Sequence, residues 1–141
     1  MTGVLPADMS FSEISGIRAD LDVEEYREGG SNDTAFFVPT RVAYSNLVCR
    51  RGLAPFGSAL LSWCFDTFAG KDNRFTVKNI VVALMNRDPS PRPYMTWTFY
   101  GALPVSWEVS EFNAMKSDVA IEKIEFKYRR MSYVSHPPAN P

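Results

Sequence analysis

The 141-residue sequence predicts a mainly β domain with one helix and a long projecting hairpin arm. Three observations predict this fold. Several segments alternate between apolar and polar residues, one segment carries apolar residues spaced by four, and a polar glycine-rich stretch directly follows an alternating segment. A period of two is typical of strands, whereas a spacing of three to four indicates an amphipathic helix. The predicted order along the chain is strands, then a helix, then strands.

The arm is predicted from residues 17–33. Residues 17–24 alternate between apolar and charged side chains, which predicts a half-buried strand. The following glycines allow positive φ, and the Ser, Asn and Asp after them bond their own backbone in turns. We expect an arm with little apolar content, which has small reason to fold back and instead contacts a neighbouring subunit. Its predicted contact residues are Tyr26, Arg27, Glu28, Gly29, Gly30, Ser31, Asn32 and Asp33.

A strand over residues 42–49 precedes the predicted helix. The helix is indicated by apolar side chains at every fourth position and ends at Gly70, because glycine readily takes the left-handed conformation at a helix end. We expect this helix to cover one side of a sheet. Its predicted core residues are Phe56, Leu60, Leu61, Cys64 and Phe68.

Three strands follow the predicted helix. Residues 75–85 are mostly apolar, which predicts a central strand buried on both faces, and a Pro-rich turn leads into a partner strand over residues 95–99. Pro104 interrupts the alternation, which resumes on the other parity. The last strand runs from Val119 to about Met131, with apolar residues on one face and charged residues, expected in solvent, on the other. These charged residues are Lys123, Glu125, Lys127 and Arg129.

The chain length is sufficient for one domain with a sizeable core and insufficient for two. We therefore predict a single domain over residues 1–131. Residues 132–141 form a Pro-rich tail that we expect to be ordered only if it docks.

Charge and hydropathy exclude several classes of function. Fifteen basic and sixteen acidic residues give a net charge of -1, which provides no electrostatic footprint for tight binding of nucleic acid or of an anionic membrane. No apolar run approaches the length of a membrane span, and the amino terminus lacks the pattern of a signal peptide. We expect synthesis in the cytoplasm and no membrane insertion.

The sequence offers little for catalysis, metals or cofactors. The only histidine, His136, lies in the tail, and no phosphate-binding glycine loop is present, so we expect no enzyme, no metal and no cofactor. The carboxylates of Glu122 and Glu125 are interpreted as solvated structural or interfacial charges, and Arg50-Arg51 as local ion-pair donors. Cys49 and Cys64 are expected to be buried free thiols, with a disulfide left open.

Six blocks carry a resemblance over nearly the whole chain. They read Phe-Ser-Glu-Ile-Ser-Gly at 11–16, Val-Glu-Glu-Tyr-Arg-Glu-Gly-Gly-Ser-Asn at 23–32, Asn-Leu-Val-Cys-Arg-Arg-Gly-Leu at 46–53, Trp-Thr-Phe at 97–99, Ala-Leu-Pro-Val-Ser-Trp at 102–107, and Phe-Asn-Ala at 112–114 leading into Asp-Val-Ala-Ile-Glu-Lys-Ile-Glu at 118–125. In this order the blocks resemble the inner tail-tube protein of contractile phage tails and extracellular contractile injection systems.

This resemblance implies an antiparallel β-barrel or sandwich with one flanking helix, closed into hexameric rings that stack into a hollow tube. It implies further copies of the chain, a sheath protein, and baseplate and tail-terminator proteins as partners, in a phage virion tail or an extracellular contractile particle. DNA or protein cargo would pass without tight binding. On this view the arm reaches neighbouring subunits, and the charged face of the last strand is the candidate lining of the lumen.

A monomeric or small-oligomer β-barrel binding module is the alternative. It differs from a tube protein in its arm, which would stay free and protease-sensitive and would not lie at an interface. The sequence leaves open whether the particle is a phage or an injection system, and whether this chain builds the main tube or a ring near the baseplate.

Overall fold

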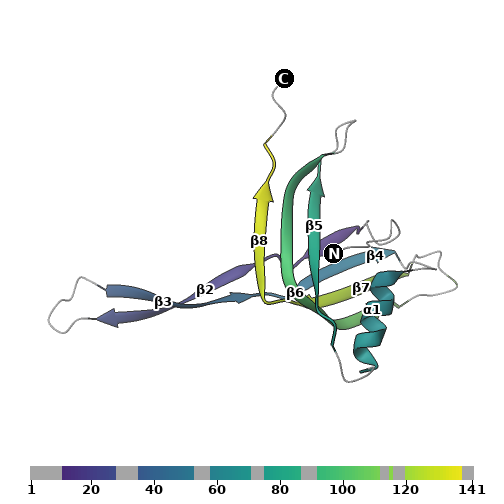
Figure 1. Ribbon diagram of the computed structural model, residues 1–141, viewed down its shortest axis with the longest axis horizontal. Coiled ribbons are helices and arrows are strands. Elements are labelled where there is room, and N and C mark those ends of the chain that lie inside the picture. Colours follow the sequence, from purple (N-terminus) through teal and green to yellow (C-terminus); the bar gives the residue numbers. More distant parts are fainter. Residues whose placement is uncertain are drawn as a thin grey trace.

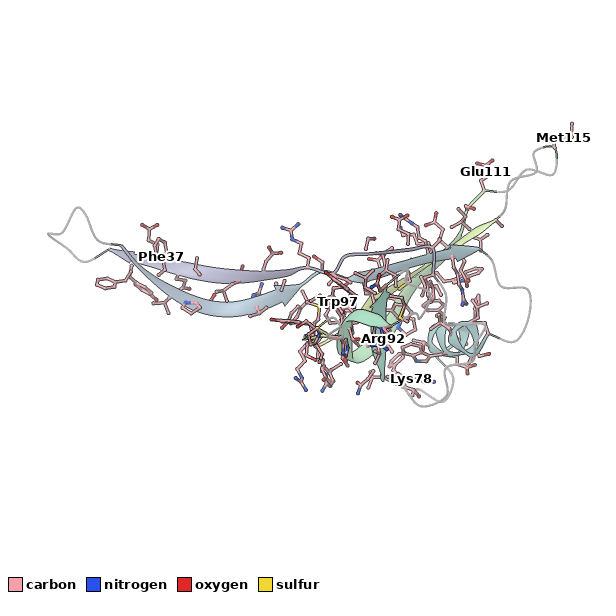
Figure 2. All side chains as sticks on the ribbon, turned by 90° about the horizontal axis from the view of Figure 1, so that it is seen from above. Phe37, Lys78, Arg92, Trp97, Glu111 and Met115 are labelled. Carbon is pink, nitrogen blue, oxygen red and sulfur yellow. The ribbon has the colours of Figure 1, made fainter. Side chains whose placement is uncertain are left out.

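The computed structural model describes residues 11–27, 35–52, 58–70, 75–86, 92–111, 115 and 120–137. It contains a curled six-stranded sheet and a two-stranded ribbon that projects from it as an arm (Figure 1). The helix lies at the other end of the longest axis. Seen from above, Phe37 marks the far part of the arm (Figure 2). In these ranges we found no helix with the length and apolar character of a membrane span.

The strands confirm a mainly β fold with antiparallel pairing throughout the described residues. The main sheet has the order β1-β4-β7-β6-β5 with β8 also paired to β6, and β2 and β3 form the arm. The elements are β1 (Glu13–Ser15), β2 (Ala19–Arg27), β3 (Ala35–Tyr44), β4 (Leu47–Gly52), α1 (Ala59–Phe68), β5 (Lys78–Met85), β6 (Pro93–Val109), β7 (Ile121–Lys127) and β8 (Arg130–Ser135).

The long strand β6 belongs to both halves of the curled sheet. Its first half pairs with β5 and β8, which rise beside it in Figure 1, and its second half pairs with β7. Phe99 and Ala102 are both fully buried, although a regular strand places residues three apart on opposite faces. Gly101 lies between them with a φ of 64° and permits this change of face. A register shift follows between Pro104 and Ser106, so the predicted interruption at Pro104 is an irregularity within one strand.

The last predicted strand is divided into β7 and β8. Tyr128 is buried and packs against Phe99 with ring centroids 4.8 Å apart, while the Arg129 amide donates to the Tyr100 carbonyl at 2.9 Å. These contacts turn the chain, and β8 then pairs with the first half of β6 through Ser135. The strand therefore extends past the predicted domain boundary at residue 131, because its backbone pairs with β6.

Two other strand predictions need correction. The strand β5 is an edge strand, and Val81 on it is 55% exposed, so burial on both faces was wrong for the single chain. Residues 42–49 do not form one strand either, because Ser45 and Asn46 separate β3 from β4. The Ser45 amide donates to the Arg18 carbonyl at 3.2 Å, which closes the base of the arm at this point.

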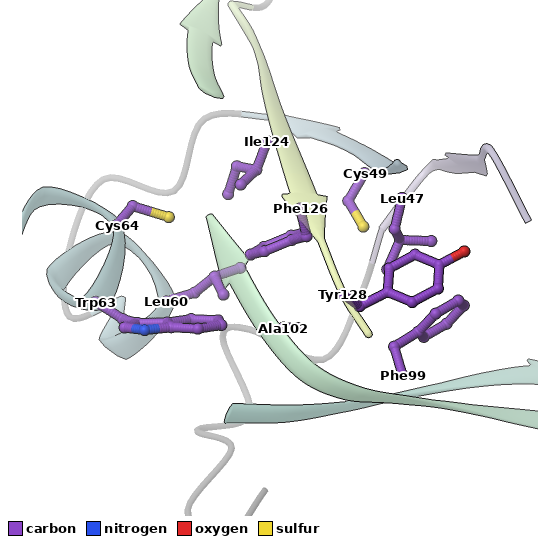
Figure 3. Packing of buried hydrophobic residues seen from close by; sticks show 10 residues of the cluster. All are labelled: Leu47, Cys49, Leu60, Trp63, Cys64, Phe99, Ala102, Ile124, Phe126 and Tyr128. Atoms are coloured by element: carbon purple, nitrogen blue, oxygen red, sulfur yellow. The ribbon is translucent and has the colours of Figure 1, made fainter. Parts of the chain in front are cut away.

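The core lies between α1 and the main sheet (Figure 3). Trp63 of α1 stacks on Phe126 of β7 with ring centroids 5.6 Å apart, and its indole N–H donates to the Thr76 carbonyl at 2.7 Å. The buried apolar residues of this cluster are Leu47, Cys49, Leu60, Trp63, Cys64, Phe99, Ala102, Ile124, Phe126 and Tyr128.

The helix is confirmed, with corrections to its core face. It begins after Ser58, whose hydroxyl accepts a hydrogen bond from the Leu61 backbone amide. Gly70 follows the helix with a φ of 61°, which is the left-handed conformation predicted for the glycine at the helix end. Of the predicted core residues, Leu60 and Cys64 are buried and Leu61 is half-buried. Phe68 is 44% exposed because it is not on the buried face of α1 formed by Leu60, Trp63, Cys64 and Thr67, and Phe56 lies outside the described residues.

A buried ion pair ties the helix to three strands. Arg51 on β4 and Glu122 on β7 lie 2.9 Å apart with almost no exposure. Arg51 also donates to the Ser58 hydroxyl at 2.9 Å, and the Trp107 indole donates to Glu122 at 2.7 Å. The solvated carboxylate predicted at Glu122 was therefore wrong, because partners distant in sequence enclose it. The arginine prediction is confirmed, since Arg50 pairs with Glu13 at 3.1 Å.

Candidate functional site: three assembly surfaces

The arm is a ribbon whose described side chains are exposed along β2 and most of β3. Opposed residues of an antiparallel pair lie on the same face, so the register sorts the side chains. In the half near the sheet, Leu21 faces Val42 on one face, and Asp22 faces Arg41 on the other. Arg41 pairs with Asp22 at 2.9 Å. This half therefore has one apolar face and one charged face.

A bulge separates this half from the outer half of the arm. The register shifts between Asp22 and Val23, and the Thr40 hydroxyl donates to the Asp22 carbonyl at 3.1 Å. Beyond the bulge, Tyr26 opposes Phe36 on one face and Phe37 lies on the other. These three rings are 54%, 53% and 66% exposed. The outer half therefore exposes large aromatic side chains on both faces, next to Glu24 on one face and Glu25 on the other.

These observations correct two expectations for the arm. The alternation over residues 17–24 does mark a strand, but β2 is exposed and not half-buried, because none of the described elements covers the arm. The arm is also more apolar than predicted. Tyr26 and Arg27 end β2, and the other predicted contact residues, 28–33, lie outside the described residues. The Tyr26 hydroxyl donates to Glu24 at 2.8 Å, which raises the pKa of Tyr26.

The second surface is the face of the main sheet opposite α1. One row of cross-strand neighbours there carries the two basic residues Arg50 and Lys123 in its middle and the acidic residues Glu13 and Glu108 at its ends. Arg50 bonds Glu13 at 3.1 Å, and Lys123 lies 4.0 Å from Glu108. In the next row, Glu125 accepts from the Asn46 amide at 3.0 Å. The face is charged but locally balanced.

The predicted lumen residues fall on this face and beside it. Lys123, Glu125 and Lys127 alternate with buried Ile124 and Phe126 along β7. Sequence reasoning therefore assigned their face correctly.

Arg129 differs from the other three, because it follows the end of β7 at the bend before β8. Its side chain lies close to Gly101, where an added Cβ would meet it at 3.2 Å. The neighbouring Arg130 covers the Tyr100 ring at 3.9 Å.

The third surface is an aromatic patch at the junction of α1 with the second half of β6. It consists of Phe65, Phe68 and Trp107. Phe65 packs edge-on against Trp107, with centroids 5.0 Å apart, and against Phe68 at 6.1 Å. Phe65 is 47% exposed and Phe68 44%. Sequence reasoning missed this patch, although one signal was present: Asp66 is the only charged residue between Ser58 and Gly70.

The described residues contain no cluster of three or more His, Cys, Asp or Glu side chains suited to a metal ion. His136 is exposed and its Nε2 lies 3.1 Å from the Thr96 hydroxyl. Cys49 and Cys64 are free and buried, which confirms the expected thiols. Burial raises the pKa of Cys49 to about 12.

Both the sequence and the fold of this chain match known proteins. Residues 5–132 match the sequence profile of the family described as T4-like virus tail tube protein gp19. No curated protein sequence gave a significant match.

Three solved structures are similar over 89–90% of this chain. A chain of the anti-feeding prophage baseplate is 29% identical with a TM-score of 0.77, and 81% of it is covered. A chain of the PVC sheath-tube complex in the extended state is 28% identical with a TM-score of 0.76 and 82% covered. A chain of the PVC sheath/tube terminator is 27% identical with a TM-score of 0.75 and 86% covered.

Proposed function

Because the chain belongs to the T4-like virus tail tube protein family, we propose that it forms hexameric rings stacked into the hollow inner tube of a contractile tail or injection system. The chain is a structural tube protein of a phage tail or of an extracellular contractile particle. The observation that carries the proposal is the arm, whose outer half exposes large apolar side chains on both faces.

The exposed arm calls for a partner because apolar surface gains free energy when it leaves water. A contiguous exposed apolar patch on a soluble chain marks an interaction site. A ring requires a heterologous interface, in which one surface meets a different surface of the next copy. The arm supplies one of these surfaces, and it projects away from the main sheet (Figure 1).

The charged face of the main sheet lines the channel in this proposal. Its cross-strand row pairs Arg50 with Glu13 and Lys123 with Glu108, so opposite charges compensate within the row. A surface without a strong field of one sign attracts neither a nucleic acid nor an acidic protein strongly. DNA or protein cargo then passes without tight binding.

The same geometry supports an outward position for α1 in the tube. Since α1 covers the other face of the sheet, it lies radially outside the channel, on the side where a sheath would surround the tube. Sheath, baseplate and terminator proteins are therefore the expected partners. The subunit is made in the bacterial cytoplasm and has no catalytic step.

Negative-stain electron microscopy of the purified protein over a range of concentrations, with light scattering on the same samples, tests the proposal. Rings or hollow tubes with six-fold symmetry are expected. A protein that stays monomeric at all concentrations, even after addition of preformed ring seeds, would contradict the proposal and favour the binding module.

A further inference from the structure

Two uncovered apolar surfaces lie at opposite ends of the molecule. The outer half of the arm lies at one end of the longest axis and α1 at the other (Figure 1). In the single chain, Phe37 on the arm is 66% exposed and Phe65 on α1 is 47% exposed. When complementary surfaces lie at opposite ends, copies associate head to tail, which is the geometry that closes rings or extends filaments.

The aromatic patch on α1 is held in a fixed shape. Phe65 packs on the Trp107 ring, and the Trp107 indole is anchored by its hydrogen bond to buried Glu122. Glu122 is itself fixed by Arg51. A surface that is already ordered loses little conformational entropy when a partner binds it. The patch is therefore suited to receive an aromatic partner and not to rearrange around it.

The outer half of the arm provides a matching amount of apolar surface. Its large side chains are Val23, Tyr26, Phe36, Phe37 and Val38. Because these side chains are divided between two faces, each face offers on the order of 200–300 Å², about a third of the roughly 800 Å² that each partner contributes to a standard stable interface. Aromatic rings in the centre of an interface also carry a disproportionate part of the binding free energy.

We propose that the outer half of the arm of one copy packs on the aromatic patch of α1 in a second copy. The inference rests on the proposed function, because it assigns the receiving surface for the arm within the tube. One face of the arm covers Phe65 and Phe68. Since Phe36 and Phe37 lie on opposite faces of the ribbon, the experiment distinguishes which of them makes this contact.

Opposite charges introduced on the two sides of the contact test the pairing. Phe36→Glu, Phe37→Glu and Phe65→Lys each place a charge on one side of the contact, at positions that are 53%, 66% and 47% exposed in the single chain. If the pairing is correct, Phe65→Lys and one of the two Glu variants raise the concentration needed for polymerisation by about tenfold or more. That Glu variant combined with Phe65→Lys in one chain then restores polymerisation, because the opposite charges meet between copies.

The matched control places Glu at both sites, and this pair should stay as defective as the single variants. Normal polymerisation of Phe65→Lys, or failure of both opposite-charge pairs to recover, would overturn the pairing while wild-type tubes still support the proposed function.

Disulfide cross-linking gives a second readout that does not depend on tubes. Phe65→Cys chains are mixed either with Phe36→Cys chains or with Phe37→Cys chains. The native thiols are buried, so covalent dimers formed on oxidation report the new cysteines. Dimers only in a mixture support the contact even if wild-type tubes are absent, and their absence from both mixtures counts against it.

Discussion

The arm and the main sheet use the same alternating pattern with opposite results. Along β7, Ile124 and Phe126 alternate with charged residues and are fully buried beneath α1. Along β2, Leu21 and Val23 alternate with charged residues in the same way, yet both are more than half exposed. The pattern therefore specifies which side chains share a face, whereas a covering element decides whether that face is buried.

This difference divides the molecule into a part that stabilises the monomer and a part for which we propose a role in assembly. The sheet and α1 enclose the core and a buried ion pair. The arm is held by its own backbone ladder and by the exposed cross-strand ion pair of Arg41 with Asp22, and an isolated two-stranded ribbon is marginally stable at best. We expect the arm to open more readily than the sheet before assembly.

Phe126→Ala should have the largest effect on the monomer. It leaves a cavity at the contact with Trp63 and is expected to lower the free energy of unfolding by about 3–5 kcal/mol. Phe37→Ala on the arm is the matched control and should change the same quantity by less than about 0.5 kcal/mol. Urea denaturation of both variants measures the difference. Equal losses would break the distinction between the two regions.

Glu122→Gln should come next. The substitution keeps the shape of the side chain but removes the charge that Glu122 places against the buried Arg51 guanidinium, at a cost of about 3 kcal/mol. Glu108→Gln is the control, because that carboxylate is 66% exposed and 4.0 Å from Lys123, where an ion pair contributes about 0–1 kcal/mol. Similar melting temperatures for the two variants would argue that the buried pair has no special role.

Tyr128→Phe should act in the opposite direction. The Tyr128 hydroxyl is buried without a hydrogen-bond partner among the described residues, and burial is also what raises the pKa of Tyr128. Removing the hydroxyl should therefore leave stability unchanged or raise it by about 1 kcal/mol. If thermal unfolding instead shows that Tyr128→Phe lowers stability by more than about 1 kcal/mol, the hydroxyl has a stabilising partner in solution.

Val42→Cys should have the smallest effect, changing the free energy of unfolding by less than about 0.5 kcal/mol. Thiol labelling of this variant still distinguishes the arm from the main sheet. At pH 8 the new thiol on the exposed arm should react in the native protein. Cys49 should not, because its pKa of about 12 keeps it protonated. Burial raises the pKa of Cys49 from 9.0 in the unfolded chain to about 12 in the folded protein. The protonated thiol therefore favours the folded state, and this contribution to the free energy of unfolding is fully present below pH 9.0 and is lost as the pH rises through about 12. Rapid native labelling of Cys49 at pH 8 would contradict this account.

Much of the fold could be predicted because local patterns specify it. The strand before the arm, the helix ending at Gly70 and the division of residues 123–127 between two faces all follow from the spacing of apolar residues. Burial was harder to predict, because coverage depends on the rest of the chain or on other copies. Phe68 and the apolar residues of β5 fit a core pattern, yet the single chain leaves them at its surface.

Contacts between distant residues account for the other differences. Glu122 looked like one more charge on a strand, and its partner Arg51 lies 71 positions away in the sequence. The turn at Tyr128 likewise depends on Phe99 and Tyr44, which local alternation does not reveal. For the candidate site, sequence identified the arm and one face of β7 but missed the aromatic patch on α1. The assignments of the arm to an interface and of the charged face to the lumen remain predictions.

Hydrogen exchange compared between the monomer and the assembled protein tests the central claim most directly, because it measures the arm and the sheet in one experiment. We predict that amides of β2 and β3 exchange readily in the monomer and become strongly protected in rings or tubes, whereas amides of β4 and β7 are already protected before assembly. Unchanged exchange of the arm on assembly would contradict the account.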